Sequence, residues 1–225
     1  MGNPEQIIMT VPTERLFRDK PFVGFSPASA YDYESQILLH YRWRRRGTEN
    51  EDPKISAEAD PTHRQPILYA LIVNPKSKRV FAYQRSSDKT EYQEPRLQGN
   101  WSWGVGGHVE RIDAREQNPL TASLDRELAQ EVKISEEITG IHKLGFINDT
   151  NAVGQVHFGV LYLVETDATS VLPGKDKEMA TGRLHTIEEL ENILETARRA
   201  PTECVVEGWS KIAFEPLTRY LFSSP

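Results

Sequence analysis

Two stretches of the chain decide its fold: WSWGVGGHVE at residues 101–110 and RELAQEVKI at residues 126–134. The first has three glycines in four positions, and such a run marks backbone that turns tightly or approaches another group closely. The second lies on a segment that opens with Asn118-Pro119, a good helix start, and repeats an aliphatic residue every fourth position up to Val132. We therefore expect a glycine loop followed by a helix with one face in the core.

Strand-like and helix-like segments flank this loop and helix. Residues 67–74 and 79–85 are apolar, branched runs on either side of a Pro-Lys-Ser-Lys turn, which predicts a hairpin. Residues 155–164 predict a central strand, and residues 187–199 and 203–221 predict two closing helices. Strands and helices mixed in this order predict an α/β fold with a mixed sheet.

The first 64 residues predict an N-terminal extension, packed on a main domain over residues 65–225. Residues 1–28 contain scattered prolines and are expected to form an irregular arm. Residues 29–46 predict a helix, and the chain after it is polar and acidic up to Gln65. Four arginines close the helix: Arg42, Arg44, Arg45 and Arg46. Basic residues suit a helix C-terminus without any ligand, and a phosphate-binding patch is the alternative.

Composition excludes several classes of protein. Acidic residues exceed basic ones by 33 to 27, so the average surface repels duplex nucleic acid. The single cysteine, Cys204, cannot form an internal disulfide. The longest apolar runs are far shorter than the roughly 20 residues that a spanning helix needs. We expect a soluble cytoplasmic protein with neither a duplex nucleic acid nor a membrane as partner; a homodimer is compatible with the sequence.

Two carboxylates on the expected helix, Glu127 and Glu131, are four residues apart and therefore project from the same face. Spacing alone favours an ordinary solvated face. The glycine loop upstream shifts the balance, because a loop carbonyl and helix carboxylates together form the all-oxygen site that Mg²⁺ or Mn²⁺ prefers. The pair is thus a candidate metal site.

With these residues the chain resembles the Nudix (MutT-like) hydrolase family, whose signature is Gly, five residues, Glu, seven residues, Arg-Glu, an aliphatic, any residue, Glu-Glu, any residue, Gly and an aliphatic. Gly107 followed by Asp113 fits the start, and residues 126–134 fit the end. The spacing between the two parts is five residues longer than in the family, Gln130 replaces a glutamate, and Lys133 replaces the glycine. The resemblance covers residues 65–217. Within the family, the chain is similar to a branch of predicted phosphoesterases. This resemblance implies a Nudix-like α/β/α sandwich with a mixed β-sheet.

The resemblance implies a divalent-metal-dependent phosphohydrolase, or pyrophosphatase, that uses Mg²⁺ or Mn²⁺. Its substrate would be a small molecule, a nucleoside diphosphate linked to another group or a related phosphoester. The residues that match metal-binding positions are Glu127, Glu131 and the carbonyl of Gly107, with Gln130 offering only a neutral oxygen. One carboxylate fewer weakens or removes one ion of a multi-metal site.

Arg126 matches the family's arginine that braces the loop and the helix. Its expected partner is Asp113, with Glu116 as the substitute. A left-handed conformation at Lys133, where the family has glycine, would cost roughly 1 kcal/mol, unless the local turn is redrawn.

Further candidates lie outside the motif. The resemblance implies one more catalytic carboxylate, expected at Glu178, with Glu165 and Asp149 as competitors. Arg85 and Arg96 are candidates to hold diphosphate oxygens, or else form surface ion pairs. His108 could contact phosphate or only fill the loop, and His157 is expected to be a hydrogen-bonded core histidine. Trp101 and Trp103 are expected to be core residues, with stacking on a base as the alternative.

Three other functions compete with the hydrolase. Gln130, Lys133 and the longer loop are compatible with a catalytically weak or inactive domain that senses a nucleotide or binds a partner. A relative of isopentenyl diphosphate isomerase would need a cysteine near Gly107, which the sequence lacks there. An RNA-directed role would depend on residues 42–46 and would show a steep salt dependence.

Overall fold

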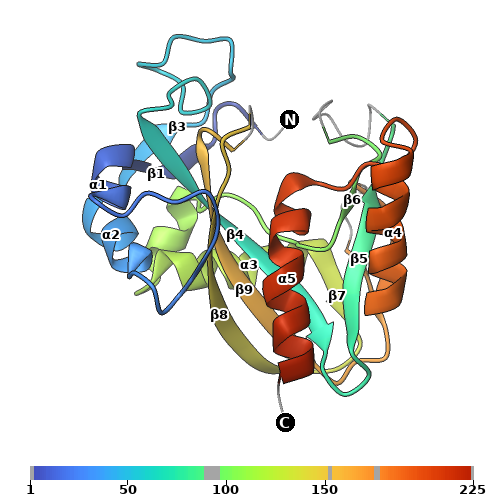
Figure 1. Ribbon diagram of the computed structural model, residues 1–225. Helices are drawn as coiled ribbons and strands as arrows, with labels where there is room; N and C mark the ends of the chain where they lie inside the picture. Colours follow the sequence, from blue (N-terminus) through green and yellow to red (C-terminus); the bar gives the residue numbers. More distant parts are fainter. Residues whose placement is uncertain (1–2, 89–96, 152–153, 175–177, 224–225) are drawn as a thin grey trace. The chain divides into compact units, whose positions relative to one another are not determined.

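The structure is a computed structural model that describes residues 3–88, 97–151, 154–174 and 178–223 (Figure 1). Internal contacts divide the chain into two compact units. Unit 1 comprises Met1–Tyr69, Gly106–Arg126 and Lys143–Leu161; unit 2 comprises Ala70–Val105, Glu127–His142 and Tyr162–Pro225. Four elements contribute residues to both units: β4 (His63–Asn74), α3 (Pro119–Glu131), β8 (Ile138–Asn148) and β9 (His157–Thr166). The expected division at residue 65 stays a prediction.

The beginning of unit 1 is regular structure, so the expected irregular arm over residues 1–28 is wrong. Its elements are β1 (Ile7–Pro12), α1 (Thr13–Phe17), β2 (Gly24–Pro27), α2 (Tyr33–His40) and β3 (Arg42–Arg45). β1 pairs antiparallel with β3 and, at its end, with β4, while β2 pairs antiparallel with β8. The prolines lie at strand ends or between elements, where a missing N–H costs least, and therefore do not prevent the strands from forming.

The expected helix over residues 29–46 is wrong in its second half. α2 starts at the Asp32 cap, whose carboxylate accepts a hydrogen bond from Ser35 N at 3.1 Å, and ends at His40. The arginines that follow form β3 instead, because β1 supplies partners for their backbone. Three of them have carboxylate partners: Arg44 with Asp60, Arg45 with Glu5 and Glu51, and Arg46 with Glu58. These ion pairs account for the basic cluster without a helix dipole.

Aromatic rings form the core of unit 1. Tyr33 on α2, Phe146 on β8 and Phe158 on β9 are at most 2% exposed. Tyr33 lies 5.1 Å from Phe146 and 5.5 Å from Phe158 between ring centroids, and Phe17 of α1 meets Phe158 edge-on at 5.7 Å. Such pairs add about 0.5–1.5 kcal/mol each beyond simple burial. The N-terminal helices are thus held to the strands by buried aromatic rings.

Unit 2 contains the expected hairpin and closing helices. β5 (Arg79–Arg85) pairs antiparallel with β4 and with β11 (Met179–Thr186). α4 (Ile187–Arg199) starts at a capping box in which Thr186 and Glu189 each bond the other's backbone N–H, and α5 (Gly208–Ser223) follows. The hairpin and α4 confirm the sequence prediction, while α5 begins five residues later than expected.

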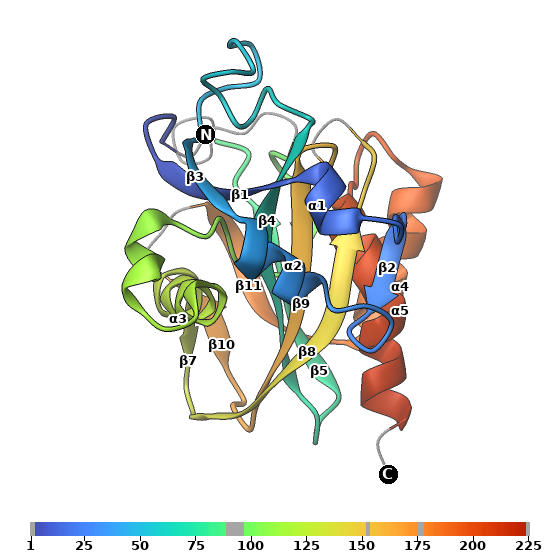
Figure 2. The ribbon, with the colours of Figure 1, turned by 90° about the vertical axis from the view of Figure 1, so that its left-hand side faces the viewer.

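The main sheet runs β11-β5-β4-β9-β8-β2, with β6 (Trp101–Ser102) beside β5. β7 (Val132–Ile134) and β10 (Val171–Pro173) form a separate two-stranded sheet and lie side by side (Figure 2). A mixed α/β class is therefore confirmed. Among the described residues, no helix combines the length and the apolar composition that crossing a membrane requires.

Candidate functional site

The arginine of the motif, Arg126, lies in a network within unit 1. Its Nε and Nη2 atoms donate to the two carboxylate oxygens of Asp113 at 2.9 and 3.0 Å. Nη2 also donates to the carbonyl of His108 at 3.0 Å, and Nη1 lies 3.1 Å from a carboxylate oxygen of Glu110. Because the pair with Asp113 is bidentate and Asp113 is 4% exposed, the guanidinium is fixed in place. The contact expected between Arg126 and Asp113 is present, and Glu116 is exposed.

The longer spacing within the motif is absorbed by a short 3-10 helix, η1 (Arg111–Arg115), and by the first turns of α3. Glu110 and Asp113 form a capping box at its start, and Asp113 accepts from Glu110 N at 2.8 Å. The Asn118 side chain then caps α3, accepting from Leu120 N at 2.9 Å. The insertion therefore leaves Asp113 within reach of the arginine.

The glycine loop approaches β4 closely in unit 1. Gly106 has φ +140°, and a Cβ there would meet the Leu68 carbonyl oxygen at 1.8 Å. Only glycine tolerates both the conformation and the approach. The Gly107 carbonyl accepts from Leu68 N at 3.0 Å, which still leaves the oxygen a second lone pair for another donor or a cation.

The carboxylates of the motif lie at the end of α3, in unit 2. Glu127 is 8% exposed, Glu131 is half-buried and Gln130 is exposed. Glu127 and Glu131 are one helical turn apart on one face, and their four oxygens form the donor set that Mg²⁺ or Mn²⁺ accepts. The residues present therefore fit a hard divalent cation in kind.

Lys133 is accommodated without left-handed backbone. It lies in β7, opposite Leu172 of β10, and the positive-φ non-glycine residues are Arg18 and Lys78 within the described chain. α3 passes directly into β7, and Gly174 N donates to the carbonyl of Glu131 at 2.6 Å. The local turn therefore differs from a glycine turn, which was the second of the two alternatives expected for Lys133.

Arg85 of β5 lies in a second ionic group, in unit 2. Its Nε donates to Glu207 at 2.5 Å, and its Nη1 lies 4.0 Å from the carboxylate of Glu178. Its guanidinium also lies over the ring of Tyr83, 5.4 Å from the centroid. The Arg85 and Glu207 side chains are about one-seventh exposed or less, whereas that of Glu178 is 49% exposed. Two of the predicted site residues, Arg85 and Glu178, are therefore neighbours.

The competitors of Glu178 have other partners. Glu165 accepts a hydrogen bond from Tyr220 at 2.9 Å and lies 3.2 Å from His142 Nε2. Burial and this hydrogen bond raise the pKa of Tyr220 to about 12. Asp149 accepts hydrogen bonds from Thr150 N and other groups in its own turn. Arg96 lies outside the described residues.

The tryptophans and histidines have mostly buried environments. Trp103 is fully buried and donates from Nε1 to the Ser210 carbonyl at 2.7 Å, which makes it a core residue. His157 is 7% exposed, and its ring lies 5.4 Å from that of His108. Both histidines lie near Glu58, a residue of the polar segment that sequence reasoning did not single out. No local pattern marks Glu58, because it lies far from both histidines in the sequence.

Two known proteins are similar to this chain over most of its length. Protein YmaB of Bacillus subtilis (strain 168) is 32% identical over 198 residues, which cover 84% of this chain and 90% of YmaB. The crystal structure of Tm1382, assigned to the Nudix hydrolases, matches with a TM-score of 0.69 at 27% identity, over 96% of this chain and 100% of Tm1382. No protein-family model matches the chain. With 96% of the chain covered, most of the first 64 residues also have counterparts in Tm1382.

Proposed function

The chain belongs to the Nudix hydrolase superfamily, and from that premise we propose that it hydrolyses a phosphoanhydride bond with the help of Mg²⁺ or Mn²⁺. The substrate class is a nucleoside diphosphate linked to another group, or a related small phosphoester. The observation that carries the proposal is the bidentate pair of Arg126 and Asp113, because it keeps the motif's brace working in spite of the longer loop. A cytoplasmic location and a homodimer stay predictions.

The roles of the residues follow from their chemistry. Arg126 of α3 donates to the His108 carbonyl and so ties the segment that follows the glycine loop to this helix. Glu127 and Glu131 would hold the cation with their carboxylates, and Gly107 would add its carbonyl. When bound, the cation supplies positive charge that offsets the negative charge of the diphosphate during attack by water.

Two further residues complete the proposal. Glu178 is half exposed and would serve as the general base, taking a proton from the attacking water. Arg85, which lies beside Glu178, would bind diphosphate oxygens. His108 is retained as a candidate phosphate contact within the glycine loop.

A screen of small phosphoanhydrides tests the activity. The full chain is incubated with nucleotide sugars, dinucleoside polyphosphates, nucleoside triphosphates and ADP-ribose, with Mg²⁺ and with Mn²⁺, and products are separated by anion-exchange chromatography. We expect cleavage that requires the cation. On a cleaved substrate, Glu127→Gln should lower kcat by about 100-fold or more, since one carboxylate ligand is lost, whereas Asp125→Asn on the exposed side of α3 should leave kcat unchanged. Equal activity of Glu127→Gln and the wild type would refute the assignment.

The exposed Gln130 favours one second candidate, a nucleotide-sensing or interaction domain with little or no activity. Calorimetry with and without Mn²⁺ separates the two functions. A sensor binds its nucleotide equally well without the cation, whereas the hydrolase needs the cation to bind it tightly.

A further inference from the structure

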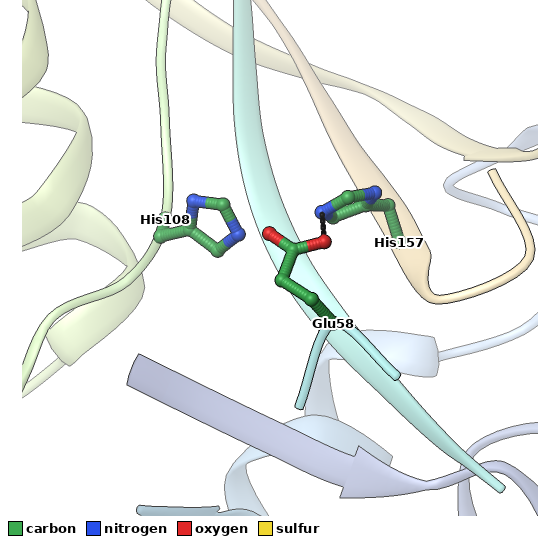
Figure 3. A group of neighbouring side chains, drawn as sticks. All are labelled: Glu58, His108 and His157. Atoms are coloured by element: carbon green, nitrogen blue, oxygen red, sulfur yellow. Dashed lines mark ion pairs between the residues drawn. The ribbon is translucent and has the colours of Figure 1, made fainter. Parts of the chain in front are cut away.

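Three side chains from distant parts of the sequence converge within unit 1 (Figure 3). Glu58 precedes β4, His108 belongs to the glycine loop, and His157 opens β9. One potential ligand atom from each lies within 4.8 Å of those of the other two. His157 Nε2 lies 3.9 Å from a carboxylate oxygen of Glu58.

We propose that Glu58, His108 and His157 bind a divalent transition-metal ion of the Zn²⁺ type. Two imidazoles and one carboxylate are a donor set that Zn²⁺ accepts in proteins, with a fourth position left for water or another group. This site shares no residue with Glu127 and Glu131 on α3 and uses nitrogen as well as oxygen ligands; ion binding would take His108 away from the phosphate contact proposed above.

The spacing of the three atoms suits an ion after a small closure. Ligands bound at about 2.1 Å in a tetrahedron lie about 3.4 Å apart. The 3.9 Å between His157 and Glu58 therefore has to shorten by about half an ångström, and the other two separations, each at most 4.8 Å, by up to about 1.4 Å, shifts that side-chain rotation can supply. The other oxygen of Glu58 accepts from Arg46 Nε at 2.9 Å, which orients the carboxylate from outside in the way that metal ligands are commonly oriented.

Gln65 is the neighbour that ion binding would rearrange. Its side chain is fully buried, its Oε1 lies 2.7 Å from His108 Nε2, and its Nε2 has no hydrogen-bond partner within the described residues. An amide oxygen accepts only from a protonated ring nitrogen, so in this arrangement the lone pair of a neutral His108 is on Nδ1. Ligation through Nε2 therefore requires the other tautomer and a turn of the Gln65 amide.

Arg46 sets the sign of a further effect. Its positive charge repels a bound cation and partly offsets the negative charge of Glu58, so it lowers the affinity of the site for Zn²⁺. Arg46→Gln removes this charge and keeps an N–H donor that can orient Glu58, so it should raise the affinity for Zn²⁺.

The test is titration of the full chain with Zn²⁺ by calorimetry, in buffer that contains excess Mg²⁺ to fill oxygen-only sites. We expect one Zn²⁺ per chain. Glu58→Gln and His157→Asn should each weaken binding by more than about 100-fold, beyond the 10–100-fold typical of losing an outer partner. Matched controls are Glu51→Gln, in the same polar segment, and His142→Asn, an exposed histidine beside Glu165; both should bind as the wild type does.

Two results overturn the proposal: a wild-type chain that binds no Zn²⁺ at micromolar concentration, or Glu58→Gln and His157→Asn that bind like the wild type. If both variants fail to fold, spectroscopy on the wild-type protein still tests the site. Co²⁺ should then give the visible absorption of a four-coordinate site, and Zn²⁺ should shift the ring NMR signals of His108 and His157 but not those of His142. Absence of both signals refutes the site.

Discussion

Arg126 in unit 1 and Arg85 in unit 2 are both largely buried arginines held by carboxylates, yet their partners differ. Arg126 has a bidentate bond to the buried Asp113, a bond to a backbone carbonyl and an ion pair with Glu110, whose side chain is 29% exposed. Arg85 has one short bond to the buried Glu207 and a 4.0 Å approach to the half-exposed Glu178. The bidentate bond to a buried carboxylate fixes the guanidinium of Arg126. Among the partners of Arg85, by contrast, Glu178 can be displaced by water or a ligand.

The difference separates structural from functional use of the same side chain. An arginine whose partners are buried has already lost its water, so breaking one contact leaves an uncompensated charge and costs stability. A partner that is half exposed contributes little to stability and is available for exchange. This is why Arg126 fits the role of a brace, and why Arg85 with Glu178 fits the handling of a phosphate.

The largest loss of stability should follow Asp113→Asn. It leaves Arg126 without its bidentate partner, and breaking a buried pair in this way costs about 3–5 kcal/mol. Urea unfolding measures the change, with Asp125→Asn on α3, next to Arg126, as the control, expected within about 0.5 kcal/mol of the wild type. A loss below 1 kcal/mol for Asp113→Asn would mean that the network around Arg126 is not a brace.

Glu207→Gln should cost less, about 2–3 kcal/mol, because glutamine keeps a hydrogen-bond acceptor for Arg85 while losing the charge. The same unfolding experiment applies, with the exposed Glu203→Gln as the control. If Glu207→Gln were as damaging as Asp113→Asn, the contrast between the two arginines would be lost.

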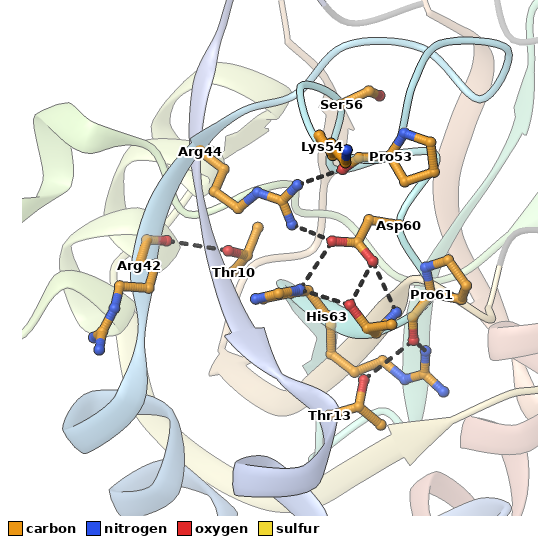
Figure 4. Close-up of polar contacts among 12 residues, drawn as sticks. Thr10, Thr13, Arg42, Arg44, Pro53, Lys54, Ser56, Asp60, Pro61 and His63 are labelled. Carbon is orange, nitrogen blue, oxygen red and sulfur yellow. Dashed lines mark hydrogen bonds and ion pairs between the residues drawn. The ribbon is translucent and has the colours of Figure 1, made fainter.

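A third buried carboxylate, Asp60 in unit 1, gives an intermediate loss of stability that can be measured by acid titration. Burial opposes ionisation of Asp60, but hydrogen bonds from Thr62 and Arg44 outweigh it and lower the pKa of Asp60 to about 2 (Figure 4). Arg44 lies 2.5 Å and His63 2.9 Å from the same Asp60 oxygen.

Because the folded-state pKa lies below the ordinary value, ionised Asp60 stabilises the fold above pH 3.8, and this contribution is lost as pH falls toward about 2. It amounts to about 2 kcal/mol. Asp60→Asn should remove that part of the pH dependence of unfolding, and Asp52→Asn in the same segment should not. A pH profile unchanged by Asp60→Asn would contradict the assignment.

The smallest change in stability should follow Glu178→Gln, under about 0.5 kcal/mol, because the carboxylate is half exposed and 4.0 Å from Arg85. Its effect on hydrolysis should nevertheless be large, a loss of kcat of about 100-fold if the carboxylate is the general base. Glu188→Gln, exposed on α4, is the control for activity. Unchanged kcat would remove Glu178 from the proposed mechanism and make its pairing with Arg85 a surface contact.

Sequence reasoning succeeded where the signal is local. The Asn118 cap and the aliphatic repeat of α3 lie within a few residues of the bonds they predict, and so does the turn of the β4–β5 hairpin. It failed for residues 1–28 and 41–46, because β1 and β3 exist through pairing with each other across a long stretch of sequence. The apolar run Ile7 to Val11 was the available signal, and the prolines around it concealed it.

By itself the sequence determined the motif: the glycine bend, the helix with two glutamates on one face, and an arginine with an acid upstream to meet it. Only the tertiary structure decided that Arg85 pairs with Glu207, that Lys133 needs no glycine, and that Glu58 meets His108 and His157. The physical reason is distance along the chain. Periodicity and capping act within one or two turns, whereas ion pairs and ligand clusters depend on which remote segments the sheet brings together.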